Sequence, residues 1–138
     1  MEEHLDRVAT AVESACEQAH NKPLTEMIKQ VVEVFVDAKM DRADISVALY
    51  RVAADVGGPE LVKRASQRMR KAVEAMLHTA PDTKSAPDAF AIDTMLAAMS
   101  GTMRSMLEAR PSPTTVRKYR EQLVLLCQSY MAVAMAQH

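Results

Sequence analysis

Apolar residues recur every three or four positions along most of the chain, which is the spacing of one face of an α-helix. This pattern predicts helices over about 2–20, 23–39, 42–56, 59–78, 87–109 and from 113 onward. The sequence therefore predicts an all-α fold, a bundle of six helices.

The segments between these helices carry residues that are typical of helix starts and stops. Asp41 is predicted to cap the third helix, and Gly-Gly-Pro at 57–59 to end it and open the fourth. Ser112 is predicted to cap the sixth helix and Pro113 to occupy its first position. The longest predicted loop is 79–87.

The apolar stripes differ in width, and the width predicts how many neighbours a helix has. The helix over 23–39 is apolar over more than half its circumference, so we expect it to lie at the centre. The last helix is apolar over roughly half its circumference, which is wide for a terminal helix. The surplus on the last two helices predicts a second partner, and a second copy of the chain is the simplest one.

Composition agrees with a helical domain: 49% of the 138 residues are apolar, with eleven Met, three Gly and no Trp. The 17 basic and 18 acidic side chains give a net charge of -1, which argues against nucleic-acid binding through summed charge. No apolar run reaches the length of a membrane helix and no signal peptide is evident. We expect one cytoplasmic, soluble domain over 1–138 without membrane contact.

No motif for catalysis, metal binding or a cofactor is present, so no enzyme and no cofactor is predicted. Cys16 and Cys127 are far apart and are expected to be buried, reduced thiols. A helical enzyme would need titratable groups gathered inside the bundle, and the candidates for such a cluster are Tyr50, Arg51, Asp55 and Asp93. A basic face on the fourth helix is interpreted as solvated surface rather than a nucleic-acid site; it comprises Lys63, Arg64, Arg68, Arg70 and Lys71.

The order and lengths of these elements resemble the C-terminal domain of the TetR family of transcriptional regulators. The resemblance is carried by residues 48–61, ALYRVAADVGGPEL, which form a short helix, a tight turn and a proline-opened restart. It is carried also by the Pro-rich corner at 110–113 between the last two helices. The resemblance implies a homodimer joined by a four-helix interface and a ligand cavity inside the bundle.

By this analogy the cavity lies between the first, second, fourth and fifth helices. Its predicted lining is Val12, Cys16, Met27, Val31, Phe35, Met69, Met76, Met95 and Met99, with Tyr50 and Arg51 as a polar edge. The predicted dimer interface contains Met103, Met106, Tyr119, Leu123, Leu126, Tyr130 and Val133. Methionine at helical spacing suits an adaptable pocket for an apolar effector, but it suits plain core packing equally well.

One departure from the family is large, because the sequence contains no helix-turn-helix unit. The chain reads as though it begins partway along the helix that would connect to that unit, so we do not expect it to bind an operator alone. The predicted function is effector binding and dimerisation in a TetR-like regulator. The alternative is a helical interaction module without a ligand, and an enclosed cavity of ~300 Å3 or more would favour the first over the second.

Overall fold

The structure is a computed structural model that describes residues 2–52 and 58–136, without the side chains of 50–52 and 58. The described residues form helices and no strands, which confirms the all-α prediction. In chain order the helices are α1 (Glu2–Gln18), α2 (Leu24–Asp41), α3 (Ala43–Val52), α4 (Gly58–Leu77), α5 (Ala89–Glu108) and α6 (Pro113–Ala134).

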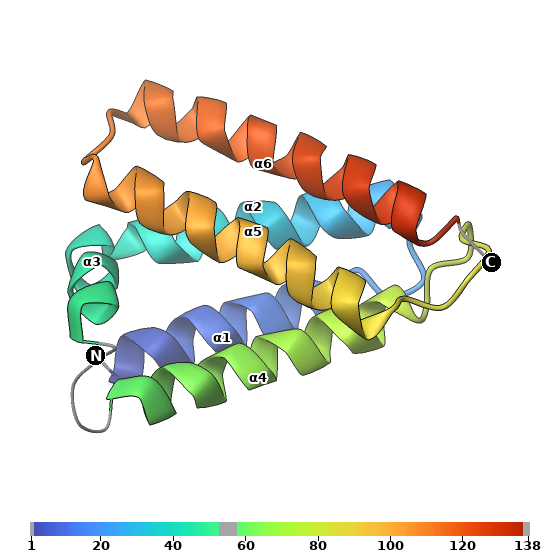
Figure 1. Ribbon diagram of the computed structural model, residues 1–138, viewed down its shortest axis with the longest axis horizontal. Helices are drawn as coiled ribbons and strands as arrows, with labels where there is room; N and C mark the ends of the chain where they lie inside the picture. Colours follow the sequence, from blue (N-terminus) through green and yellow to red (C-terminus); the bar gives the residue numbers. More distant parts are fainter. Residues whose placement is uncertain (1, 53–57, 137–138) are drawn as a thin grey trace.

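Helix α2 lies at the centre of the bundle and packs against each of the other five helices, as its apolar width predicts (Figure 1). Helices α1 and α4 run side by side along one edge, and α5 and α6 lie on the other side of α2. The short helix α3 stands at the end of the bundle where α1 begins. The loop between α4 and α5 lies at the opposite end, beside the end of α6.

One continuous apolar core joins α1, α2, α4, α5 and α6. Methionines supply much of its volume, since several of them are among the largest side chains that are fully buried; these are Met27, Met76, Met99, Met103, Met106, Met131 and Met135. A smaller cluster joins α1, α3 and α4 near the start of α1, through Leu5, Ala9, Leu49 and Ala65. Each cluster buries the inward stripe that the helical spacing predicts.

The loop between α4 and α5 is tied to the bundle through its backbone. The carbonyl oxygen of Met135 accepts bonds from the backbone N–H groups of Lys84 and Ser85 and from the Ser85 hydroxyl. The Asp82 carboxylate accepts a bond from the N–H of Leu24 at the start of α2. The loop therefore satisfies backbone groups at the ends of two helices, which have no partner inside their own helix.

The predicted helix starts are confirmed in one case and wrong in another. The Ser112 hydroxyl accepts a bond from the N–H of Thr115, and Pro113 begins α6, as predicted. Asp41 does not cap α3, because it is the last residue of α2 and α3 begins at Ala43. The chain turns at Arg42, whose guanidinium instead pairs with Asp44 in the first turn of α3.

Candidate ligand-binding and dimerisation sites

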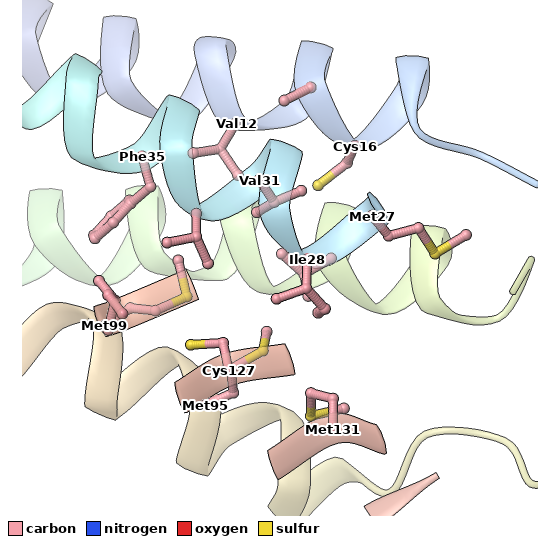
Figure 2. Packing of buried hydrophobic residues seen from close by; sticks show 14 of the residues in the cluster. Val12, Cys16, Met27, Ile28, Val31, Phe35, Met95, Met99, Cys127 and Met131 are labelled. Carbon is pink, nitrogen blue, oxygen red and sulfur yellow. The ribbon is translucent and has the colours of Figure 1, made fainter. Parts of the chain in front are cut away.

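A small hollow lies between α1, α2, α4 and α5, which is the predicted place of the ligand cavity. Its lining contains five of the predicted residues, namely Val12, Val31, Phe35, Met69 and Met99, together with Ser66, Val73, Leu96 and Ser100. Figure 2 shows Val12 and Val31 on neighbouring helices, and Phe35 of α2 on the side of Met99 of α5. The walls are apolar, and the two serines give the rim its hydroxyl groups.

The hollow is much smaller than a ligand site. Its volume is about 50 Å3, whereas pockets for small molecules occupy ~300–1,000 Å3. The other four predicted residues whose side chains are described do not line it; Cys16, Met27, Met76 and Met95 fill the core instead. Figure 2 shows three of them there, Cys16, Met27 and Met95. In this arrangement the methionines act mainly as core packing.

The predicted polar edge cannot be placed, because the side chains of Tyr50 and Arg51 lie outside the described residues. The same holds for Asp55, one of the candidates for an enzyme site. The fourth candidate, Asp93, is an exposed partner of Arg70 on the surface, with 2.6 Å between the two groups. Asp93 therefore lies on the surface and not inside the bundle.

A larger opening, which the sequence did not predict, is a groove of about 630 Å3 between α3 and the end of α5. It is lined by Met40, Ala43, Asp44, Val47, Ala48, Leu107, Glu108, Arg110 and Pro111. Helical spacing gave no sign of it, because a groove arises where two helices diverge rather than from the pattern along either one.

The predicted dimer residues divide into two groups. Met103, Met106 and Leu123 are buried within the subunit, where its own side chains already cover them. The other four are exposed on one side of α6, and we call Tyr119, Leu126, Tyr130 and Val133 the α6 stripe. Leu126 is 51% and Val133 62% exposed, and Leu125 is exposed as well, on another side of α6. The surplus apolar width of α6 therefore corresponds to surface that the subunit leaves uncovered.

Two residues of the basic face of α4, Arg68 and Arg70, pair with neighbouring carboxylates. Arg68 contacts Asp6 and Glu13 of α1 at 2.6 Å each, and these contacts raise the pKa of its guanidinium. Arg70 pairs with Glu74 on its own helix, besides Asp93 on α5. These two residues thus join α4 to α1 and α5.

The two cysteines are buried and unpaired, as predicted. Burial, with a contribution from Glu13, raises the pKa of the Cys16 thiol to about 12, and burial raises that of Cys127 to about 11. Both thiols stay protonated at neutral pH and are unreactive. Within residues 2–52 and 58–136, no three side chains of the usual metal-binding types converge on one point. In the same residues, no helix combines the length and the apolar character needed to cross a bilayer.

A buried polar contact joins α1, α2 and α3. His4, only 3% exposed, lies with its Nε2 atom 2.7 Å from the hydroxyl of Ser46, which is itself fully buried. The Ser46 hydroxyl donates to the carbonyl oxygen of Lys39 at 2.9 Å, so it accepts its bond from the Nε2–H of His4. The Nδ1 atom of His4 is buried and has no hydrogen-bond partner among the described residues.

This geometry favours the neutral imidazole. Burial lowers the pKa of His4, and the nearby charges of Lys39, Arg7 and Arg42 lower it further. Burial also lowers the pKa of Lys39, whose ammonium lies 5.7 Å from the ring centre of Phe35 in the wall of the hollow. A second proton on His4 would therefore place an uncompensated charge among cations.

The family of the chain follows from comparison with known sequences. Residues 23–131 match the family model described as Tetracyclin repressor-like, C-terminal domain. Because this match covers most of the chain, the protein belongs to that family. Its members usually bind ligands and dimerise, and they are typically regulatory rather than enzymatic. No curated protein and no solved structure shows significant similarity to the chain.

The His4 contact predicts how stability depends on pH. The folded pKa of His4 lies below its usual value, so the unfolded chain binds the proton first as pH falls. The free energy of unfolding should therefore decrease below about pH 6.5, the usual pKa of histidine. In His4→Gln, whose amide can still donate to Ser46, this decrease should be smaller between about pH 6.5 and pH 5, above the range in which carboxylates dominate. Urea unfolding of both proteins at several pH values in that interval measures the free energy of unfolding. If it decreased equally steeply with falling pH in both proteins, the prediction would be contradicted.

Proposed function

We propose that this chain is the effector-binding and dimerisation domain of a TetR-like transcriptional regulator. DNA recognition resides in a helix-turn-helix unit that this sequence does not contain. The observation that carries the proposal is the exposed apolar stripe on α6, together with the family of the chain. The small hollow between α1, α2, α4 and α5 supports the ligand-binding part.

The α6 stripe is built for a helical partner. Its four residues follow one another at intervals of seven, four and three positions, so they share one side of the helix. Large apolar side chains gathered in this way on a surface are typical of protein interfaces. A two-fold axis brings the stripe against its own copy, and two such helices with their α5 neighbours make a four-helix interface.

Helix α5 adds a surface that a partner helix can approach closely. Ala97, Gly101 and Ser105 recur at intervals of four residues and are all exposed. Gly101 lies in the middle of the helix, where glycine is unfavourable. The described residues give no reason for its small size, since a Cβ atom there would meet none of their heavy atoms within 4 Å apart from the adjoining backbone of α5. A second copy packed on α5 supplies the reason.

The ligand is a small, largely apolar molecule that enlarges the hollow. Met69 and Met99 are flexible and polarizable, so they can move aside and still make favourable contacts with the ligand. A molecule that binds the enlarged state better shifts the population toward it, and α1, which also lines the hollow through Val12, would transmit the change. The hydroxyls of Ser66 and Ser100 at the rim orient any polar group.

The second candidate function, an interaction module without a ligand, is favoured by one observation. The hollow has a volume of about 50 Å3, and a void of this size holds at most a water molecule or two. The interior is therefore close to a fully packed core. Both functions require the dimer, so ligand binding is what separates them.

The rim of the hollow provides the test of ligand binding. Ser66 is exposed on α4 and lines the hollow, whereas its neighbour Gln67 is also exposed and does not. Small apolar compounds that raise the melting temperature of the wild type should lose their effect in Ser66→Trp, where the indole closes the mouth. Gln67→Trp should respond as the wild type does. If no apolar compound stabilises the wild type, the interaction module is the correct function.

The dimer is tested on α6. Leu126→Asp places a charge in the centre of the α6 stripe, and burying it unpaired would cost several kcal/mol, so light scattering should show a shift toward the mass of one subunit. Ala132→Asp, on the other exposed flank of the same helix, should remain dimeric. A wild type that stays a single subunit at high concentration would refute the interface.

Gly101 allows an independent test that does not disturb the core. Gly101→Ala should raise the free energy of unfolding of the subunit by about 1 kcal/mol, because alanine is the better helix former. Gly101→Gln should fold as well as the alanine variant but form a weaker dimer, since its side chain occupies the space reserved for the partner helix. Sedimentation at several concentrations measures the difference, and equally strong dimers in both variants would exclude α5 from the interface.

A further inference from the structure

We propose that the groove between α3 and the end of α5 is a second binding site, for a small monoanion with an apolar tail. This site is separate from the hollow inside the bundle, and none of its lining residues is shared with it. Its volume of about 630 Å3 falls within the usual range of small-molecule pockets, ~300–1,000 Å3.

The floor of the groove suits an apolar tail. Met40 at the end of α2, Val47 on α3 and Leu107 on α5 present apolar side chains to it from three helices. Pro111 continues the apolar wall into the corner before α6. Covering this surface releases water from it, and the gain grows with the apolar area that the tail buries.

The charges at the edge of the groove select the headgroup. Both lining carboxylates are already paired: Asp44 with Arg42 at 3.1 Å, and Glu108 with Arg104 at 3.1 Å. Arg110 also lines the groove, and no side-chain hydrogen bond or ion pair joins it to another described residue. The lining itself thus carries two carboxylates and one guanidinium, and the arginines that pair with the carboxylates lie outside it. With these two arginines included, the positive charge left over is the Arg110 guanidinium, which complements one carboxylate or sulfonate.

The backbone conformation of Arg110 also supports a binding site at this position. Its φ of 49° lies in the left-handed region, just after the end of α5, where glycine or asparagine is the easier residue. Arginine in this conformation lowers the free energy of unfolding relative to glycine. It also places a long cationic side chain at the edge of the groove. Strained residues of this kind gather at binding sites.

Occupation of the groove acts on α3, which is joined to the start of α1. Asp44, Val47 and Ala48 line the groove from one side of α3. Ser46 projects from another side of the same helix and holds His4 of α1. A ligand that displaces this ten-residue helix therefore changes the contact of Ser46 with His4. Through that contact it changes the position of the start of α1.

The experiment uses three probes with the same apolar tail and different heads: octanoate, octanol and octyltrimethylammonium. Their binding to the full chain is measured by calorimetry, and the imidazole signal of His4 is followed by NMR during the titration. Octanoate should bind most tightly and the cation least. The His4 signal, assigned from its absence in His4→Gln, should move as octanoate saturates the protein.

Four variants locate the site. Arg110→Asn keeps a residue that tolerates the left-handed conformation, and it should weaken octanoate binding by about fivefold, as expected for an exposed ion pair. Val47→Trp, which fills the groove, should abolish binding. Arg64→Asn, which removes an exposed arginine on α4, and Ser66→Trp, which closes the hollow, should both leave octanoate affinity unchanged.

Equal affinity for all three probes, or an unchanged affinity in Arg110→Asn, would overturn the proposal. Loss of octanoate binding in Ser66→Trp with no effect of Arg110→Asn would place the ligand in the hollow, which overturns this second site and supports the proposed function. A His4 signal that stays fixed at saturation would overturn the connection from α3 to α1. Because Arg110 is exposed and its replacement suits the backbone, the test does not depend on the folding of Val47→Trp.

Discussion

The packing of α2 against all five other helices is the constraint on which the rest of the structure depends. A helix that is apolar over more than half its circumference is stable in water only when neighbours cover it from several sides. The buried side of α2 carries Met27, Ile28, Val31, Val32, Phe35 and Val36, each 3% exposed or less. The other helices arrange themselves around this surface, and their own inward stripes are buried by the same contacts.

The central place of α2 also decides which surfaces remain open. Helices α5 and α6 cover one side of it, and no other helix in the described part of the chain lies against the outer sides of those two helices (Figure 1). The α6 stripe and the small residues of α5 are therefore left toward solvent. At the end of α2, α3 turns away after Arg42 and meets only the last part of α5, which leaves the groove between them.

The sequence predicted most of the fold because helical spacing and turn residues are local signals. Six helices, the central place of α2 and the cap at Ser112 all follow from such signals. Asp41 shows the limit of these local signals. Its residue type favours a helix cap, but α2 continues to Asp41 and the chain turns one residue later, at Arg42. The dimer residues show another limit, because spacing alone did not separate Met103, which faces the core, from Leu126, which faces outward. The candidate sites were predicted less well, because the size of a hollow depends on how side chains from four helices fit together. The family resemblance correctly indicated five residues of the hollow. The groove was not predicted, because no periodic pattern along the chain indicates it.

Helix α3 is the element best suited to respond to a ligand. It is the shortest helix in the described part of the chain, so it shares less buried surface with the bundle than its longer neighbours do. Its contact with α1 combines the small apolar cluster around Leu5 and Leu49 with one buried polar pair, and that pair leaves the Nδ1 atom of His4 without a described partner. A buried polar group without a partner costs free energy, so the observed arrangement is favoured over alternatives by less than a fully bonded one would be. Elements with few contacts and small energy gaps are the ones that change position when a ligand binds. The large apolar surfaces of α2 hold the longer helices in place, so the movement of α3 that we propose is that of a short element against a fixed bundle.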